Sequence, residues 1–269
     1  FAAVAQNVFP AVDGYTSARS FGPYSEALAA RCIGAAAFRD SSDNVYIYAG
    51  TTSKLYETNS TAWTDVTNVT EDYEVSSETQ WEFAQWEENK VIATAFYDGA
   101  EAGTAVTFPQ IKSMGTGDFA NMLTDPAPGT TTFRARHLCV CREFVVFGNV
   151  EYDGTAYPNR IWWTGYNDET TITPDASTQA GNVDIQGSGK VQRVLGGEAI
   201  TVVCETSTHR LTYTGPPTIW QRDEIYPNIG TPYPWSVVQF GDRIWMWSRE
   251  GFVELGPGGV EWIGYGRVD

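Results

Sequence analysis

Residues 35–67 read AAAFRDSSDNVYIYAGTTSKLYETNSTAWTDVT, and this stretch decides the fold. Apolar and polar residues alternate within it in four short runs, at residues 35–38, 45–50, 53–57 and 63–66. Turn-forming residues separate the runs, most clearly at residues 40–44 and 59–60. Alternation with a period of two is typical of β-strands with one buried face. The stretch therefore predicts a meander of four antiparallel strands.

The same order of strands and turns recurs farther along the chain. Its clearest copy lies near the end, with expected strands at residues 235–240, 243–248, 251–255 and 260–263. Three looser copies lie between these two units. Their expected strands are residues 82–86 and 90–97 in the first; 134–141, 143–149, 159–164 and a weak 170–173 in the second; 190–195, 198–205, 209–214 and 218–223 in the third. A turn or two of helix is expected at residues 25–31.

The units begin near residues 35, 81, 134, 190 and 235, so the repeat is about 45 to 55 residues long. Four-stranded blades of a β-propeller have this period, and they stack around an axis because one small sheet cannot bury both of its faces. We therefore predict an all-β fold, a β-propeller of about five four-stranded blades at residues 35–269. Residues 1–34 would form an N-terminal arm or closing segment. The alternative is a β-sandwich, which gives no reason for a four-strand repeat.

Aromatic residues make up 14% of the 269 residues, as expected if they fill the wedges between blades. Three of the units place a tryptophan in the fourth strand, and we expect these to be blade-core aromatics: Trp63, Trp220 and Trp262. Two other tryptophan pairs, Trp162-Trp163 and Trp245-x-Trp247, could instead offer flat platforms for sugar rings. Packing between blades is the favoured interpretation of both pairs.

The charge balance is strongly acidic, with 33 Asp and Glu against 17 Lys and Arg and a net charge of −16. Affinity for nucleic acid comes largely from basic side chains that neutralise phosphates, so this surface should not bind DNA. The hydrophobic share of 42% is large enough to bury a core. The longest apolar stretches fall far short of the roughly 18 to 20 residues that a membrane span needs. No membrane span is predicted.

Metal, cofactor and disulfide sites are not predicted. The four cysteines, Cys32, Cys139, Cys141 and Cys204, are too few and too scattered for a disulfide scaffold, and we expect them to be reduced. His137 precedes two of them, but no second ligand pair follows at zinc spacing, so small buried side chains are the favoured interpretation. Residues 40–44 contain two aspartates but lack the Gly and the distal Glu of an EF-type calcium loop, which indicates a turn.

A catalytic site is not predicted either, and we expect that the protein is not an enzyme. His137 and His209 are the two histidines, and neither has a nucleophile elbow or a triad-like neighbourhood in the sequence. The glycine-rich stretches at residues 187–189 and 256–259 lack the spacing and the lysine of a phosphate loop, and they indicate hairpin turns. The functional alternative that stays open is a propeller that binds carbohydrate or hydrolyses glycosides.

Negative charge is densest in two neighbouring stretches. The candidate residues for an acidic channel or surface are Glu71, Asp72, Glu74, Glu78, Glu87 and Glu88. A solvated loop is the simpler interpretation. The more specific interpretation is that these residues form one wall of a passage for a polyanion. Like charge lowers adhesion to phosphate, so the polyanion could pass without being bound.

The N-terminal quarter resembles a family of bacteriophage virion proteins, the propeller-bearing nozzle or hub proteins in the tails of short-tailed phages. The resemblance covers about residues 1 to 67, and its motifs are Asn7-Val8-Phe9-Pro10, Gly14-Tyr15, Phe21-Gly22-Pro23-Tyr24-Ser25, Gly34-Ala35, Tyr46-x-Tyr48-Ala49-Gly50-Thr51, Lys54-Leu55-Tyr56 and Trp63-Thr64-Asp65-Val66. Beyond residue 67 the similarity is one of architecture.

The resemblance implies a structural protein in the virion tail, made in the host cytoplasm. It implies a ring of identical copies, commonly a hexamer, below the portal and adaptor, whose acidic central channel lets the genome pass. The expected partners are then further copies of the chain, the portal or adaptor and other tail proteins, with DNA as passing cargo. The missing Met and the abrupt end at residues 266–269 lead us to expect that the chain is part of a longer product.

Overall fold

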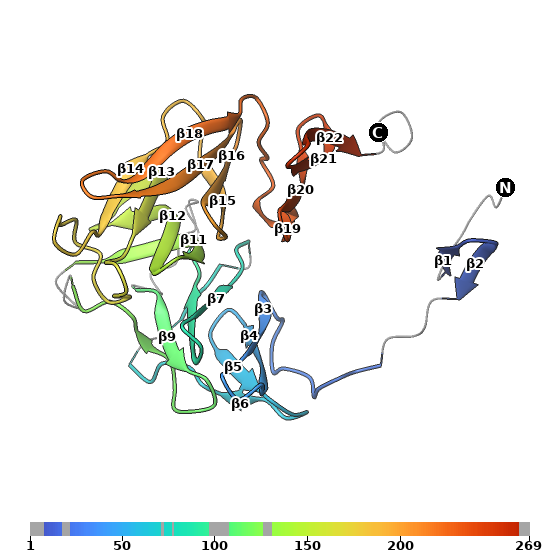
Figure 1. Ribbon diagram of the computed structural model, residues 1–269. Coiled ribbons are helices and arrows are strands. Elements are labelled where there is room, and N and C mark those ends of the chain that lie inside the picture. Colours follow the sequence, from blue (N-terminus) through green and yellow to red (C-terminus); the bar gives the residue numbers. More distant parts are fainter. Residues whose placement is uncertain are drawn as a thin grey trace.

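The computed structural model describes residues 8–17, 22–70, 73–76, 78–96, 108–125 and 131–263. Five four-stranded antiparallel sheets follow one another along the chain and stand around a common axis as propeller blades (Figure 1). We number them blades 1 to 5 in chain order. In every blade the strands are hydrogen-bonded in the order of the sequence, so each blade is a simple meander. The predicted fold class is confirmed.

The blades have the following strands. Blade 1 contains β3 (Ala35–Arg39), β4 (Val45–Gly50), β5 (Leu55–Thr58) and β6 (Thr64–Asp65). Blade 2 contains β7 (Glu82–Trp86), β8 (Lys90–Thr94), β9 (Gln110–Ser113) and β10 (Ala120–Asn121). Blade 3 contains β11 (Phe133–Cys141), β12 (Phe144–Tyr152), β13 (Thr155–Trp163) and β14 (Gly181–Asp184). Blade 4 contains β15 (Val191–Leu195), β16 (Ile200–Cys204), β17 (Thr208–Gly215) and β18 (Ile219–Tyr226). Blade 5 contains β19 (Val238–Phe240), β20 (Arg243–Ser248), β21 (Gly251–Gly256) and β22 (Gly259–Ile263).

The first strand of each blade lies nearest the axis. β3 lies against β7, β7 against β11, and β11 against β15. The ends of these strands also meet across blades, since Gln85 Nε2 donates to Arg39 O at 2.8 Å and Cys141 Sγ contacts Gly197 O at 3.3 Å. The turns that follow the first strands therefore gather on one face of the propeller, which we call the first-hairpin face.

Hydrophobic layers fill the spaces between successive blades. Blades 1 and 2 share one around Tyr48 and Trp81, and blades 2 and 3 share one around Phe147. Close approach explains Gly50: a Cβ there would lie 2.1 Å from Trp81 Cδ1, and the indole uses the space to donate to Thr51 O at 2.8 Å. Aromatic side chains thus act as wedges between blades, as the composition predicted.

The ring of blades is open between blade 5 and blade 1. The chain forms an arc in Figure 1, with blade 1 and blade 5 at its two ends. β19 still contacts blade 4, since Gln239 Nε2 donates to Gly196 O at 3.2 Å. One face of blade 5 packs on blade 4 through Ile244 and Val253. Its opposite face, which we call the aromatic face, carries the apolar residues Val238, Phe240, Trp245, Trp247, Phe252 and Ile263 together with the charged residues Arg243, Glu254 and Glu261. Of the six apolar side chains, all but Trp245 are exposed, by 41 to 79%.

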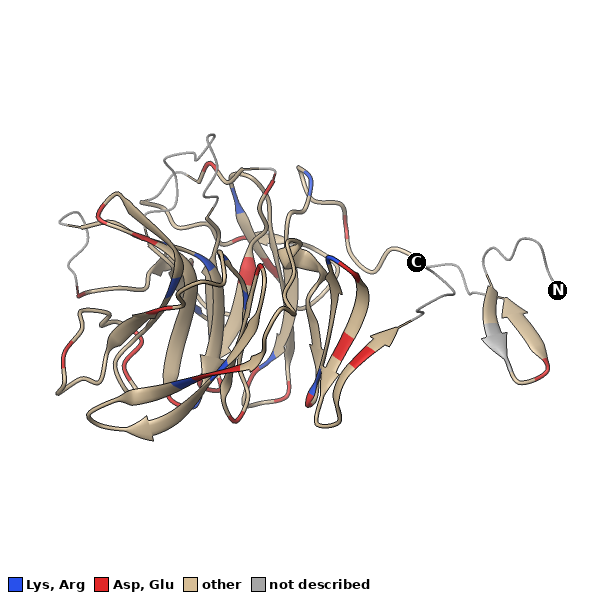
Figure 2. Cartoon of the chain, turned by 90° about the horizontal axis from the view of Figure 1, so that it is seen from above, with Lys and Arg blue, Asp and Glu red and all other residues tan. Residues whose placement is uncertain are grey.

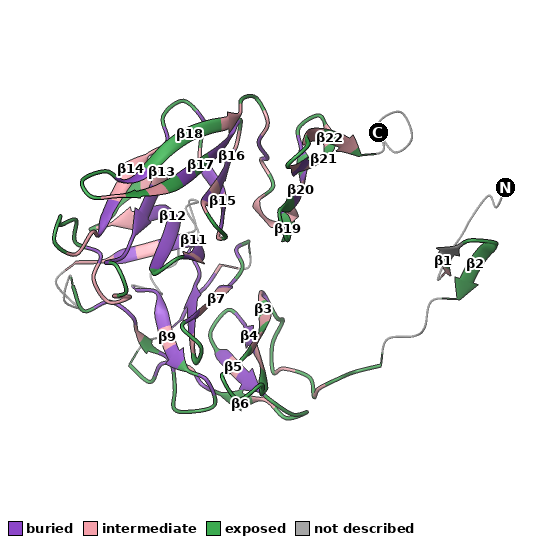
Figure 3. Ribbon diagram, in the orientation of Figure 1, coloured by how far each residue is buried: buried purple, intermediate pink, exposed green. Residues whose placement is uncertain are grey.

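The degree of burial differs between the middle and the ends of the arc. In Figure 3 the buried strands are concentrated in the middle of the arc, whereas β18 of blade 4 and the strands of blade 5 contain more exposed residues. A blade in the middle has a neighbour on each face, whereas a blade at an end has one neighbour. The aromatic face is therefore exposed because no other blade among the described residues packs on it, although it carries several large apolar side chains.

An N-terminal hairpin of β1 (Val8–Ala11) and β2 (Gly14–Ser17) stands apart from the arc (Figure 1). The segment that follows is tied to blade 1, because Glu26 N donates to Thr61 O and Ile33 N donates to Gly50 O, both at 2.8 Å. The helix expected at residues 25–31 is wrong: this segment is irregular, and Glu26 N bonds to blade 1 instead of to its own segment.

Two further details of the strand prediction are wrong. The fourth strand of blade 3 is β14, not residues 170–173. Those residues bond elsewhere, since Thr171 forms a parallel bridge with Asp125 and Ile172 O accepts from Trp162 Nε1 at 2.7 Å. The expected place of Trp63 is also incorrect, because it precedes β6 and its indole donates to Glu26 O at 3.0 Å, so it holds the N-terminal segment.

The other two expected blade-core tryptophans lie in the fourth strands. Trp220 in β18 is buried between blades 3 and 4, and Trp262 in β22 packs partly buried on the layer between blades 4 and 5. Helix is limited in the described residues to the 3-10 turn η1 (Pro234–Ser236), and none of them forms a helix with the length and apolar character needed to span a membrane.

Candidate functional site

Side chains from three blades meet near the axis in a buried ionic network. Glu82 begins β7, His137 lies in β11 and Arg193 lies in β15. His137 Nδ1 lies 2.6 Å from Glu82 Oε1, and Leu138 N donates to Glu82 Oε2 at 3.1 Å. The Arg193 guanidinium forms an ion pair with the same carboxylate. Trp235 covers the network, its ring centroid 5.6 Å from that of His137.

The electrostatics of the network favour a neutral histidine and an ionised glutamate. Burial acts to raise the pKa of Glu82, but the charge of Arg193 and the bonds from His137 and Leu138 outweigh it and hold the pKa below its ordinary value. Burial lowers the pKa of His137 despite the nearby carboxylate. His137 therefore donates its Nδ1 proton to Glu82, and its Nε2 has no hydrogen-bond partner among the described residues.

The chemistry open to this network is limited by its burial. A carboxylate that orients an imidazole is half of a nucleophilic triad, but the described residues bring no hydroxyl or thiol within hydrogen-bond distance of His137 Nε2. His137 is completely buried, so no substrate reaches it in this arrangement. The network joins blades 2, 3 and 4 across the axis, and it occupies the place where a channel through the propeller itself would run.

A second histidine lies in a closed hydrogen-bond network in blade 4. His209 Nε2 lies 2.8 Å from Ser207 Oγ and 2.9 Å from Ser188 Oγ, and the two hydroxyls are 2.7 Å apart. All three side chains are buried, and His209 Nδ1 has no hydrogen-bond partner among the described residues that could orient the ring. Burial lowers the pKa of His209. The arrangement ties two turns of blade 4 together.

Acid is expected to destabilise the fold through these two histidines. Burial holds both pKa values below the ordinary 6.5, so the unfolded chain takes up protons at a higher pH than the folded chain. The stability that depends on neutral histidine is complete above 6.5 and is lost as the pH falls toward the folded pKa values. The urea midpoint of unfolding should therefore decrease between about pH 7.5 and about pH 5.

The matched variant is His209→Asn, which removes one titrating group from the closed network. Its unfolding midpoint should depend less steeply on pH over the same range, even though the variant is less stable at neutral pH. Measuring above about pH 5 separates the histidines from the carboxylates, which titrate at lower pH. An unchanged slope in the variant would show that His209 is not the source of the pH dependence.

The predicted acidic residues are divided between two ends of β7. Glu87 and Glu88 form the turn after β7 on the first-hairpin face, whereas Glu74 and Glu78 precede β7. All four are exposed. Glu71 and Asp72 lie outside the described residues. The structure therefore brings Glu87 and Glu88 together and separates them from Glu74 and Glu78.

The first-hairpin face carries more carboxylates than the sequence analysis found. Every blade has at least one acidic residue in its first turn, and we call this set the acidic rim: Asp40, Asp43, Glu87, Glu88, Glu143, Glu198 and Asp242. Neighbouring turns touch, since Asn89 Oδ1 accepts from Ser41 N at 3.0 Å and from Ser41 Oγ at 2.9 Å. The recurrence of an acidic residue at one position of each repeat was the signal that could have revealed the rim.

Basic residues partly neutralise the rim. Lys90 lies 3.2 Å from Glu87 and 2.8 Å from Glu169, and Arg39 lies 3.3 Å from Asp43. Figure 2 shows acidic and basic positions distributed over the blades, with acidic segments in several exposed loops. The turn at residues 40–44 closes on itself, because Asp40 accepts from Ser42 N and Asn44 N at 2.8 Å. The Asp40 carboxylate therefore stabilises the turn, and the stretch is a turn as the sequence indicated.

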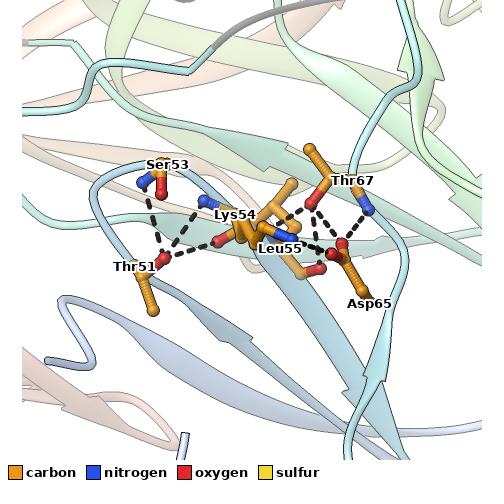
Figure 4. A network of polar contacts seen from close by, with 6 residues as sticks. All are labelled: Thr51, Ser53, Lys54, Leu55, Asp65 and Thr67. Carbon is orange, nitrogen blue, oxygen red and sulfur yellow. Dashed lines mark hydrogen bonds and ion pairs between the residues drawn. The ribbon is translucent and has the colours of Figure 1, made fainter. Parts of the chain in front are cut away.

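An outer groove between blades 1 and 2 has a volume of about 620 Å³. Lys54, Asp65, Thr67, Asn68 and Asp118 are among its lining residues. Figure 4 shows that its polar groups satisfy one another: Asp65 accepts from Thr67 Oγ1 at 2.6 Å and forms an ion pair with Lys54. Within the described ranges no three His, Cys, Asp or Glu side chains are grouped to hold a metal ion.

The aromatic face of blade 5 contains an exposed stack of rings. Trp247 lies between Tyr233 and Phe252, with ring centroids 5.1 Å and 5.4 Å apart. Trp162 and Trp163, by contrast, are buried at 3% and 5% exposure and cannot serve as a platform. Of the two pairs considered for sugar stacking, Trp245-x-Trp247 alone contributes an exposed indole.

No protein-family model matches the sequence, and no curated protein matches it. Among solved structures, the extracellular domain of a putative hybrid two-component system, BT4673 of B. thetaiotaomicron, gives a TM-score of 0.54 at 12% identity, covering 87% of this chain and 28% of that one. The AfRom2 CNH domain gives 0.40 at 10% identity, covering 96% and 68%, and the polysaccharide lyase Uly1 gives 0.40 at 7%, covering 84% and 55%.

The BT4673 match supports the propeller architecture and concerns the fold alone. The chain spans 28% of the length of that extracellular domain.

Proposed function

We propose that the chain is a self-assembling structural component of a bacteriophage tail, of the nozzle or hub type. Copies would form a ring around the path of the DNA, in contact with the portal or adaptor and other tail proteins. The protein would act in the virion tail as a rigid platform rather than as an enzyme. The N-terminal sequence resemblance motivates this proposal, and the open arc gives it a physical basis.

The observation that carries the proposal is the exposed aromatic face of blade 5. Phe240 is 79% exposed and Trp247 is 48% exposed, on a sheet face whose counterparts in blades 1 to 3 are buried against the next blade. Large contiguous apolar surfaces on soluble proteins mark sites of association. An arc with one such face at its end favours contact with another polypeptide, and a contact between two different surfaces of identical copies generates a ring when it closes.

The charge distribution supports the proposed passage of DNA between copies. The Glu82 network occupies the axis of the propeller, so the duplex would pass outside each propeller and along a surface that the ring turns inward. The acidic rim would suit such a surface, because carboxylates repel phosphates and leave the duplex free to slide.

We expect the purified chain to assemble into closed rings at high concentration, and the variant Trp247→Glu to prevent it. A charge on the aromatic face would have to be desolvated in the interface, which is expected to weaken association at least tenfold. Sedimentation velocity and electron microscopy measure this directly. The control is Val69→Glu, at a position that is 84% exposed and lies in the loop after β6, away from the aromatic face. Persistent monomers of the unmodified chain would contradict the proposal.

A second candidate function is carbohydrate binding, which the Tyr233, Trp247 and Phe252 stack favours. Aromatic faces bind the apolar faces of sugar rings, and Glu254 lies on the same sheet face with Trp245 Nε1 donating to it at 2.9 Å. Screening on a glycan array separates the two candidates. If the unmodified chain forms rings and also binds a glycan, and Trp247→Ala abolishes the glycan binding, the protein has both functions. If the unmodified chain binds a glycan but forms no rings, carbohydrate binding replaces the structural role.

A further inference from the structure

The N-terminal hairpin lacks the packing that a two-stranded sheet needs. Hairpins of two strands are marginally stable in water unless another surface covers them. Phe9 and Tyr15 are 57% and 61% exposed, one on each face of the hairpin, since Phe9 pairs with Thr16 and Tyr15 with Pro10. Among the described residues, β1 and β2 pair with each other and with no other strand. Within the described part of the chain, both faces of the hairpin are therefore open to a partner surface.

The tether allows that surface to lie well away from blade 1. The first firm anchor after the hairpin is Glu26, whose N–H bonds to Thr61 O. Eight residues lie between Ser17 and this anchor, so the two positions can be up to about 30 Å apart. Figure 1 shows the hairpin apart from the arc, on the side where the arc is open.

The aromatic face of blade 5 is a suitable surface for such a hairpin. It is a sheet face of exposed large side chains, with Trp247 and Phe252 stacked at 5.4 Å. Sheets pack face to face about 10 Å apart through side chains of this kind. The hairpin would bury one of its two aromatic residues against the stack, since Phe9 and Tyr15 lie on opposite faces.

Charge favours the hairpin over other surfaces as the point of contact between two copies. Each copy has a net charge of −16, so contact between two bodies is opposed by repulsion. Residues 8–17 carry a single charged side chain, Asp13. The hairpin is thus a nearly neutral and apolar element that can reach a neighbour while the acidic bodies stay apart.

We propose that the β1–β2 hairpin of one copy packs on the aromatic face of blade 5 of a second copy. This inference rests on the proposed self-assembly and names the contact that produces it. The donor surface and the acceptor surface are different, so each copy gives a hairpin to one neighbour and receives one from the other. Such a head-to-tail contact builds a ring when its rotation closes.

Photo-crosslinking from the hairpin tests the proposal in the full chain. Tyr15 is replaced by the photoreactive amino acid p-benzoylphenylalanine, and the irradiated sample is separated by mass under denaturing conditions. The expected product has twice the mass of the chain and contains a peptide from residues 238–263 joined to residue 15. The matched control places the same photoreactive residue at Tyr24. This position is exposed and lies two residues before the anchor Glu26, so it stays close to blade 1 and should not join to blade 5.

Each other outcome overturns the proposal. A crosslink to residues 238–263 within one chain would show that the hairpin closes the gap of its own copy. A double-mass product joined to another segment would assign a different acceptor surface, and the absence of any crosslink would leave the hairpin without a partner. Product yield should fall at least tenfold when Trp247→Glu is added to the photoreactive chain, because the acceptor face is then charged.

Deleting residues 1–21 separates this inference from the proposed function. Loss of rings in the truncated chain, with a blade fold that still unfolds cooperatively, is the result expected. Rings that persist without the hairpin would refute the hairpin contact and leave the proposed self-assembly intact. An unmodified chain that never assembles and gives no crosslink would refute both.

Discussion

Replacing Glu82 with alanine is expected to lower the free energy of unfolding by about 3 kcal/mol. The carboxylate is buried and binds His137, Leu138 N and Arg193 at once, so its removal leaves a guanidinium and an imidazole without their shared partner. Removing one member of a buried ion pair commonly costs about 3–5 kcal/mol, and the lower end applies because Arg193 keeps some contact with solvent. Urea unfolding monitored by tryptophan fluorescence measures the change.

The control is Glu88→Ala, which removes an exposed carboxylate from the turn at the other end of the same strand. It should change the free energy of unfolding by no more than about 0.5 kcal/mol, as is usual for exposed positions. A similar small effect for Glu82→Ala would mean that the network does not hold blades 2, 3 and 4 together. The unfolding curves also show whether blades 2, 3 and 4 unfold in a single transition, as expected if they unfold as a unit.

Phe147→Ala is expected to destabilise the fold by about 3–5 kcal/mol, the usual range for truncating a fully buried phenylalanine. Phe147 has no exposed surface, and its ring lies 5.2 Å from that of Phe133 in the layer between blades 2 and 3. The cavity left behind cannot collapse easily, because strands on both sides are held in their sheets. Thermal and urea unfolding of the purified variant measure the loss.

Phe252→Ala is the comparison variant, since it makes the same truncation on the exposed aromatic face of blade 5, at the open end of the arc. With 48% of its surface exposed, Phe252 should contribute about 1 kcal/mol or less in the monomer. Equal losses for the two variants at low protein concentration would show that the aromatic face is covered by the chain itself. That result would remove the basis for a docking surface.

The blade repeat could be predicted from the sequence because the strands are local. Alternation and turn residues fixed most strands to within one to three residues, as in β20 (Arg243–Ser248). The short strands β9 and β10 were not predicted, since four residues and two residues carry too little alternation to be recognised. The fourth strand of blade 3 was misplaced because distant bonds, such as that from Trp162 Nε1 to Ile172 O, hold residues 170–173 outside the sheet.

The site residues depend on contacts that a single sequence does not reveal. Glu82 and Arg193 are 111 positions apart, and their pairing follows from the curvature of the arc. His137 was not expected to belong to a site, and its partner Glu82 lies 55 positions away, where no local pattern points to it. The acidic rim could have been found by aligning the repeats with one another, since its members occupy the same turn in each blade.

The open arc makes the blades unequal in their resistance to local unfolding. In a linear stack, the free energy of opening one unit includes the interfaces with its neighbours. Blades 2, 3 and 4 have two such interfaces, whereas blade 5 has one, so its backbone amides would exchange with solvent before those of β12 or β16. Occupation of the aromatic face would give blade 5 its second interface, and the order in which blades open would then depend on protein concentration.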